Sequence, residues 1–365
     1  MKKMFLLLCV SVTLGACTSK QVKDATVLEP EIVLPIVIEE ESVESEEEIE
    51  ETEMEEDLTG KATSALTGIC IDEEDAQRRP VAVVINNLKQ ALPQSGIGQA
   101  SLYYEVLAEG DITRIVAIFQ EFDSKKIGPI RSTRHYFSHF ALDHDAIFTH
   151  HGGSDAGFKA IADYKINNLD GRHLDGTAVW RDPSRRYEHS AYSNAENLLN
   201  AAQERYGYRM ETREFEPMFD FYEEFTEPTT DADAEANCVT VNFLARTHNV
   251  FEYDEQSQLY KKFQNGEEHI DEEMGKQLTV TNVLIQNAAH SAIPNDTEGR
   301  IDVKLVGSGT GYLATAGKYI PVNWSKASPN SPTIWTDENG EKLKLNKGKT
   351  WVNIVSTNIV PVFDA

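Results

Sequence analysis

A strongly acidic segment near the N-terminus limits how much of this 365-residue chain can enter a folded core. Residues 20–57 carry sixteen acidic side chains and two lysines, a net charge of −14, and the stretch 39–57 is dominated by glutamate with few apolar residues. Such a composition cannot bury enough surface to offset the entropy lost on ordering, and its like charges extend the chain. We therefore predict an acidic tether over residues 17–66 and a folded part over residues 67–365. A role in binding calcium or a cationic partner is the alternative interpretation of the tether.

The first sixteen residues have the features of a secretory signal peptide. Lys2 and Lys3 precede an apolar run over residues 4–15, and Leu14–Cys17 (LGAC) places small residues before a cysteine. This tetrapeptide resembles a bacterial lipobox, which implies cleavage before Cys17 and acylation of that cysteine, for example with palmitate. Because the apolar run is shorter than the ~20 residues of a spanning helix, we expect Cys17 to anchor the chain in the lipid bilayer, on the extracytoplasmic face of the cell membrane. An uncleaved anchor and a plain signal peptide are the alternatives.

Two cysteines, Cys70 and Cys238, fall in the predicted folded part. An extracytoplasmic location permits a disulfide between them. Two free buried thiols are the alternative, because two cysteines define no spacing framework.

The folded part divides in the sequence near residues 226–236, a Pro/Thr/Asp/Ala segment without apolar periodicity. The first domain, 67–228, alternates patterns typical of strands and helices, which favours an α/β arrangement around a mixed sheet. We expect strands within 80–87, 112–122 and 145–151, and helices within 99–111, 135–144, 154–164 and 194–208. Ser193 and Glu196 form a capping-box pattern before the last helix.

The second domain, 229–365, consists of short alternating runs that predict strands. Asn265-Gly266 and Asn339-Gly340 are dipeptides typical of hairpin turns. The predicted fold class is therefore α+β, an N-terminal α/β domain with a mixed sheet followed by a smaller, mostly-β domain.

Arginines are concentrated in the first domain. The whole chain has a net charge of −26, which argues against nucleic acid as a partner. Residues 113–189 nevertheless carry eleven basic and ten acidic side chains. Arg131 and Arg134 follow a predicted strand, where ligands gather in open α/β sheets, and a guanidinium matches phosphate or carboxylate. We predict an anion site whose members are Arg131, Arg134, Arg114, Gly152, Gly153 and Ser154, the last three offering a helix N-terminus, with Arg181, Arg186 and His189 as accessory residues. The alternative is that these arginines pair with nearby aspartates.

Seven of the ten histidines lie within residues 135–189. His135 and His139, four residues apart, would share a helix face and could hold zinc with His144 or Asp143. A nucleophilic triad of Ser132 or Ser154 with His189 and Asp182 can also be drawn. Neither an H-E-x-x-H nor a G-x-S-x-G pattern supports these two alternatives. We therefore predict no metal and no cofactor, and we assign no catalytic residue.

The chain resembles the YerB-like lipoprotein family in several segments taken in order over about 67–360. Among them are YEVLAEGDITR (104–114), IGPIRSTRHYF (127–137) and HHGGSDAG (150–157) in the first domain, and VGSGTGYLATAGKYIPVNWSKAS (306–328) in the second. The family has glycine where this chain has Asp111, and favours Pro-His-Asn over residues 188–190. The resemblance implies an envelope lipoprotein with two domains of unknown function and no assigned reaction.

Residues 111–134 are also similar to the strand–turn–strand of the LytR-CpsA-Psr glycopolymer ligases, in which arginines hold a substrate pyrophosphate. The chain lacks that family's Pro-Arg-Asp ending. Three functions follow as hypotheses. The first is a surface lipoprotein that binds an anionic glycopolymer or an envelope protein through its arginines. The second is a phosphotransferase or ligase acting on lipid-linked glycopolymer precursors. The third is a non-catalytic envelope scaffold.

Overall fold

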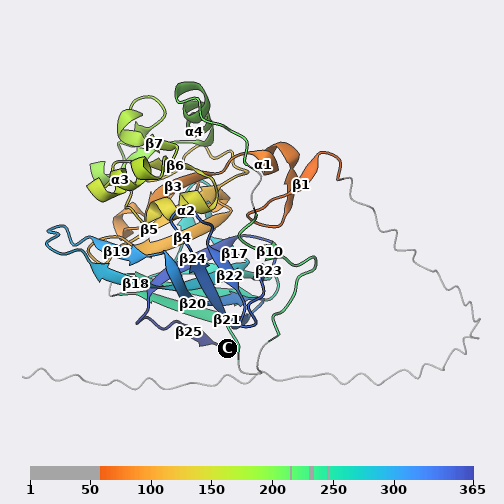
Figure 1. Cartoon of the computed structure of the whole chain (residues 1–365). Helices are drawn as coiled ribbons and strands as arrows, with labels where there is room; N and C mark the ends of the chain where they lie inside the picture. Colours follow the sequence, from red (N-terminus) through yellow and green to blue (C-terminus); the bar gives the residue numbers. More distant parts are fainter. Residues whose placement is uncertain (1–57, 214–215, 230–233, 245–246) are drawn as a thin grey trace, which may run out of the picture. The chain divides into compact units, whose positions relative to one another are not determined.

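A mixed β-sheet of eleven strands passes through both halves of the folded chain (Figure 1). The structure is a computed structural model that describes residues 58–213, 216–229, 234–244 and 247–365. The predicted signal peptide, Cys17 and most of the predicted tether therefore lie outside the described residues. Within the described part of the chain, no helix combines the length and apolar character needed to cross a membrane.

Ten strands of this sheet follow one another in the order β22-β21-β20-β18-β24-β4-β5-β3-β6-β7, and β19 pairs with β18 outside that path. Their bounds are β22 (Ile334–Thr336), β21 (Lys318–Lys326), β20 (Gly307–Thr315), β18 (Asn282–Ala292), β24 (Thr350–Ser356), β4 (Leu102–Leu107), β5 (Thr113–Phe119), β3 (Val81–Asn86), β6 (Ile147–His150), β7 (Asn168–Asp170) and β19 (Ile301–Lys304). The strands β3, β6 and β7 are mutually parallel, as are β18, β24 and β4. The parallel pairing of β24 with β4 joins the two sequence halves in one sheet.

The two faces of this sheet bury separate apolar clusters. Alternate residues of β3 enter different clusters, Val83 on one face and Val84 on the other. The helix α2 (Phe137–Asp143) packs on the Val84 face, while α4 (Ala195–Asn200) and a second sheet pack on the Val83 face. That six-stranded sheet contains β14 (Glu267–Glu268), β13 (Leu259–Gln264), β12 (Thr247–Asp254), β11 (Cys238–Phe243), β25 (Val362–Asp364) and β17 (Thr279–Val280). The predicted α+β class is thereby confirmed.

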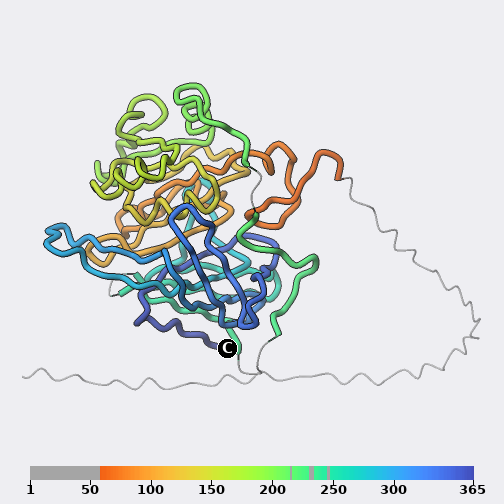
Figure 2. The backbone as a smooth tube through the Cα atoms, viewed as in Figure 1, coloured from red at the N-terminus to blue at the C-terminus, as the bar shows by residue number. Residues whose placement is uncertain are grey.

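Shorter elements complete the described chain. The helices α3 (Asp155–Asp163) and α4 lie at the end of the molecule that carries β6 and β7 (Figure 1). The connection between β18 and β19 projects from the body of the fold (Figure 2). The remaining elements are α1 (Glu73–Gln77), β1 (Lys61–Thr63), β2 (Cys70–Asp72), β8 (Trp180–Arg181), β9 (Ala191–Tyr192), β10 (Asp220–Phe221), β15 (Ile270–Asp271), β16 (Lys276–Gln277), β23 (Lys344–Leu345), four short 3₁₀ turns and one π turn (Ala201–Arg205).

The helix predicted within residues 99–111 is wrong, because Leu102–Leu107 form strand β4. All six residues of β4 are buried, since β24 and β5 flank the strand and both faces of the sheet are covered. A strand buried on both faces shows no alternation of apolar and polar residues. Its apolar positions then match a helical spacing by coincidence.

Three further predictions need correction. The folded part begins before residue 67, because Lys61–Thr63 pair with β2. The N-cap of α4 is Asn194, whose side chain accepts from the Asn197 amide at 2.7 Å, and not Ser193, whose hydroxyl donates to the Ala178 carbonyl at 2.7 Å. Cys70 and Cys238 are free thiols in the structure and do not form the disulfide considered above.

Asp271 links the two halves of the sequence through backbone amides. It is fully buried, and its Oδ1 accepts from Gly96 at 3.1 Å and from Glu273 at 2.8 Å. Its Oδ2 accepts from Gly98 at 2.6 Å. Both oxygens of one carboxylate therefore hold the 96–98 turn of the first half against the second half.

We expect Asp271→Asn to lower the free energy of unfolding by about 1–3 kcal/mol, because the new amide group would face the Gly98 donor and leave it unsatisfied. Urea denaturation measures the change. Asp254→Asn is the control, since Asp254 also accepts two backbone amides but sits in a partly exposed turn. It should change stability by no more than about 0.5 kcal/mol. Equal effects of the two substitutions would contradict the linking role of Asp271.

Candidate anion-binding site

Two of the predicted arginines share a single carboxylate. Arg114 on β5 donates from Nη2 to Glu109 Oε1, and Arg134 donates from Nε to Glu109 Oε2 at 2.9 Å. Arg114 also donates to the Ser132 carbonyl at 2.8 Å, and Arg134 to the Thr133 carbonyl at 2.6 Å. The sequence order β4–Glu109–β5 places the carboxylate at the turn between the two strands, next to Arg114.

The turn itself explains one departure from the family sequence. Asp111 adopts φ = 60°, in the left-handed region that glycine enters without steric cost. Aspartate is among the few other residues enriched in that region. The geometry that sets Arg114 beside Glu109 is thus kept with aspartate in place of glycine.

A cleft of about 200 Å³ opens beside this ion-paired group. Four separate segments form it: the β4–β5 turn, the segment before α2, the loop after β6 and the β18–β19 connection. Its lining residues are Glu109, Ser132, Arg134, Gly153, Ser154, Glu298 and Arg300. We call this feature the arginine cleft. It brings together Arg134, Gly153 and Ser154 of the predicted site, and Arg114 lies buried behind Glu109.

The electrostatics of the group are dominated by crowded guanidinium groups. Burial and, to a smaller extent, the neighbouring Arg134 lower the pKa of Arg114 to about 9, while Glu109 opposes the shift. Burial alone would raise the pKa of Glu109, but Arg114 and Arg134 hold it below its ordinary value. The pKa of Arg131 is lowered by burial and by Arg134, with Glu109 again opposing. Arg114 and Arg134 thus share the Glu109 carboxylate, and Glu188 acts on Arg131 as a further carboxylate.

Arg131 and the accessory residues lie beside the arginine cleft and do not line it. Arg131 donates from Nη1 to the Glu188 carbonyl at 2.8 Å. Arg181 contacts Asp175 at 3.1 Å and lies 4.4 Å above the Tyr187 ring. The side chain of His189 is hydrogen-bonded to Asn86 at 2.7 Å, and burial lowers its pKa. Arg186 lies in the same loop and is exposed.

The glycine loop is largely engaged by the protein itself, which corrects part of the predicted anion site. The Gly152 amide donates to Asp170 at 3.0 Å, and the Ser154 amide donates to the Thr133 carbonyl at 3.3 Å. The Ser154 hydroxyl accepts from the Gly157 amide and caps α3. These two amides are therefore not free for an anion, so Arg134 and Arg300 are the cations that face the arginine cleft.

The zinc and triad alternatives are not assembled. His135 faces Asp302 at 2.8 Å, while Asp143 is ion-paired with Lys326 and His144 is hydrogen-bonded to Tyr104. Within the ranges that the structure covers, no three His, Cys, Asp or Glu side chains are placed to hold a metal. The triad residues are engaged elsewhere: Ser132 donates to the His151 carbonyl, Ser154 caps α3, and Asp182 pairs with Lys126.

Sequence reasoning missed Glu109, Glu298 and Arg300. Glu109 lies within the YEVLAEGDITR segment that carries the family resemblance, so the sequence contains a signal that could have identified it. Arg300 reaches the arginine cleft through a β-bridge to Glu109, although the two residues are far apart in the sequence. No local sequence pattern predicts such a contact.

The described fold and site define a class of protein, a two-part α+β protein whose halves share one sheet and whose arginine cleft has no assigned activity. A model described as "Protein of unknown function (DUF3048) N-terminal domain" matches residues 66–209, and the model of the DUF3048 C-terminal domain matches residues 239–352. The chain therefore belongs to the YerB-like family of DUF3048 proteins, which confirms the resemblance seen in the sequence.

Two comparisons with Bacillus subtilis support this membership. The protein named "Putative lipoprotein YerB" from strain 168 is 33% identical over 304 residues, which cover 82% of this chain and 88% of the relative. The crystal structure of YerB protein from Bacillus subtilis has a TM-score of 0.74 at 32% identity, and the match covers 83% of this chain and 100% of that chain.

Proposed function

We propose that this chain is a surface lipoprotein whose folded part binds an anionic group of an envelope ligand in the arginine cleft. The observation that carries the proposal is the sharing of Glu109 by Arg114 and Arg134, with Arg131 close by and in no ion pair with any described residue. Crowded, buried guanidinium groups are unfavourable unless further negative charge is supplied. A phosphate or carboxylate in the arginine cleft would supply it.

The position of Arg300 supports an exchangeable ligand. Arg300 pairs with Asp296 at 3.1 Å on the projecting β18–β19 connection and remains partly exposed. Arg134, by contrast, is held by Glu109 and by the Thr133 carbonyl. A fixed cation on one wall and an adjustable cation on the other wall suit bidentate recognition of an anion.

The lipoprotein part of the proposal rests on the LGAC tetrapeptide at residues 14–17 and on the name of the Bacillus subtilis relative. An acyl anchor at Cys17 followed by an acidic tether would present the arginine cleft to ligands near the membrane surface.

Binding of pyrophosphate to the full chain in neutral detergent, followed by isothermal titration calorimetry, tests the arginine cleft. We expect Arg300→Gln and Arg134→Gln to weaken binding about ten- to a hundredfold, because each removes a charge-assisted hydrogen bond. The control is Lys159→Gln on α3, whose side chain is 74% exposed and, among the residues that the structure describes, is ion-paired with Asp163 alone. Unchanged affinity in Arg300→Gln, which should fold normally, would refute the site.

A further inference from the structure

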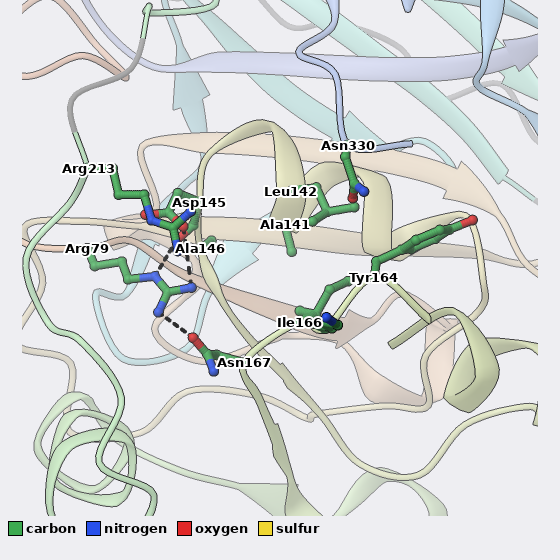
Figure 3. A pocket seen from close by; sticks show the side chains of 11 residues that line it. Arg79, Ala141, Leu142, Asp145, Ala146, Tyr164, Ile166, Asn167, Arg213 and Asn330 are labelled. Carbon is green, nitrogen blue, oxygen red and sulfur yellow. Dashed lines mark hydrogen bonds and ion pairs between the residues drawn. The ribbon is translucent and has the colours of Figure 1, made fainter. Parts of the chain in front are cut away.

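A second cavity, larger than the arginine cleft, lies at the opposite end of the parallel strands from that cleft. It has a volume of about 450 Å³ and is formed where β6 and β7 begin, while the arginine cleft lies beyond the end of β6. Figure 3 shows the residues around it, which come from the end of α2, from the α2–β6 and α3–β7 connections, from the residues before β3 and from the segments that carry Arg213 and Asn330. Its volume falls within the range of about 300–1,000 Å³ of small-molecule sites.

One side of this cavity is cationic. Arg79 is 5% exposed, and it donates to the Asp145 carbonyl at 2.5 Å and to Asn167 Oδ1 at 2.7 Å. Asp145 is also ion-paired with Arg209, so two guanidinium groups again share one carboxylate. Lys165 and Arg213 also line the cavity, and neither forms an ion pair with any residue that the structure describes. The lining of the cavity as a whole therefore has positive charge in excess.

The pKa of Arg79 reflects the cations that crowd around it. Burial lowers the pKa of Arg79, and Arg209 and Arg213 add to the shift, while Asp145 opposes it. A bound anion beside Arg79 would relieve the same unfavourable charge. The arrangement thus resembles a site that lacks its counter-charge.

The other side of the cavity is apolar and carries one ring. Leu142, Tyr164 and Ile166 line it, and Figure 3 places them apart from the Arg79, Asp145 and Arg213 group. Asn330 adds a side-chain amide at the rim. An ion alone would leave this wall without a contact. A ligand that carries both an anionic group and an apolar ring would fill both sides.

We propose that this cavity binds a small organic phosphate ester, with the phosphate against Arg79 and Arg213 and a ring against Tyr164, Leu142 and Ile166. Several cations opposite one carboxylate favour a dianionic group, and phosphate monoesters supply one at neutral pH. The two sites lie at opposite ends of β6, so this proposal does not rest on the arginine cleft.

Phenyl phosphate is the probe, titrated by calorimetry into the full chain in neutral detergent. The double variant Lys165→Gln/Arg213→Gln should bind it at least about tenfold more weakly than the wild type, because it removes two of the three cations that line the cavity. Arg79 is left in place, since it ties Asp145 and Asn167 to the fold. Lys159→Gln should bind as the wild type does. Phenyl phosphate should also bind about two- to tenfold more tightly than inorganic phosphate, because the ring contacts Tyr164.

Two outcomes would overturn the proposal. If the double variant keeps the wild-type affinity while Arg300→Gln loses binding, phenyl phosphate binds in the arginine cleft and the second cavity is not a site. If inorganic phosphate binds as tightly as phenyl phosphate, the apolar wall has no role and the ligand class is wrong. Loss of pyrophosphate binding in Arg300→Gln together with loss of phenyl phosphate binding only in the double variant would support both sites separately.

Discussion

Replacing Lys262 with methionine is expected to lower the free energy of unfolding by about 3–5 kcal/mol at neutral pH, the cost of breaking a buried ion pair. Lys262 on β13 and Glu105 on β4 are both fully buried, with Nζ 3.9 Å from Oε2. The substitution leaves Glu105 charged in the core without its cation. It also removes the partner of Asn249 Oδ1 at 3.1 Å and of His269 Nδ1 at 2.9 Å.

The effect should be large because the pair belongs to a network that ties the two halves of the chain. Glu105 Oε2 accepts from Asn249 at 2.6 Å and from the Trp351 indole at 3.1 Å. Glu105 Oε1 accepts from Asn87 and from Thr113, both at 2.8 Å. In the Lys262→Met variant, each of these donors still points toward the Glu105 carboxylate, but the cation that neutralises this carboxylate is gone.

Stability should also depend on pH in a way that identifies Lys262. Burial lowers the pKa of Lys262 from 10.5 to about 8, with Glu105 opposing the shift. Between about pH 8 and 10.5 the folded chain has lost this proton while the unfolded chain still binds it, so the free energy of unfolding rises with pH. The slope is up to about 1.4 kcal/mol per pH unit. The stability difference between wild type and Lys262→Met should therefore widen across this window, as measured by urea denaturation at several pH values.

Lys261→Met is the matched control for this experiment. Lys261 is the adjacent residue, and its side chain is 44% exposed and pairs with Asp254 at the surface. Its replacement should cost no more than about 1 kcal/mol and leave the pH dependence unchanged. Glu105→Gln/Lys262→Met should recover part of the loss, since it removes the unpaired charge. A pH-independent difference between wild type and Lys262→Met would contradict the lowered pKa.

This pair of lysines also shows what the sequence can and cannot predict. Residues 259–264 lie in one of the runs that predict strands, and the Asn265-Gly266 hairpin turn after them is confirmed, with φ of 54° and 82°. The sequence does not say which of two adjacent lysines faces inward. That depends on where the strand lies relative to β4 and β24, elements more than 80 residues away along the chain. Long-range packing, and not the local sequence pattern, therefore decides which lysine faces inward.

The candidate site likewise has some features that the sequence predicts and others that only the tertiary structure reveals. Arg134 beside a glycine-containing helix start could be predicted, because local spacing places it near a strand end. Glu109 and Arg300 complete the arginine cleft through tertiary contacts, which one sequence does not reveal. The predicted role of the Gly152 and Ser154 amides failed for a related reason. Asp170 and the Thr133 carbonyl, brought in by tertiary structure, already accept from them.

Replacing Cys17 with alanine is expected to abolish acylation of the chain completely. The thiol and amine of Cys17 are the groups that a lipobox cysteine would offer, so alanine leaves no acceptor for the thiol-linked chain. Metabolic labelling with an alkyne fatty acid, followed by gel fluorescence, measures the loss. Without processing at residue 17, the chain should also run at the larger size of the precursor that keeps residues 1–16.

Cys9→Ala is the matched control, because Cys9 lies within the apolar run that would be removed with the signal. It should leave both the label and the mature size unchanged. A single acyl chain gives only marginal binding to a bilayer, and a second lipid signal is needed for stable anchoring. A Cys17 that carries lipid on both thiol and amine meets this requirement, so the processed wild type should partition fully into detergent. An unlabelled wild type found in the medium would instead show a plain signal peptide, and the arginine cleft would then act away from the membrane.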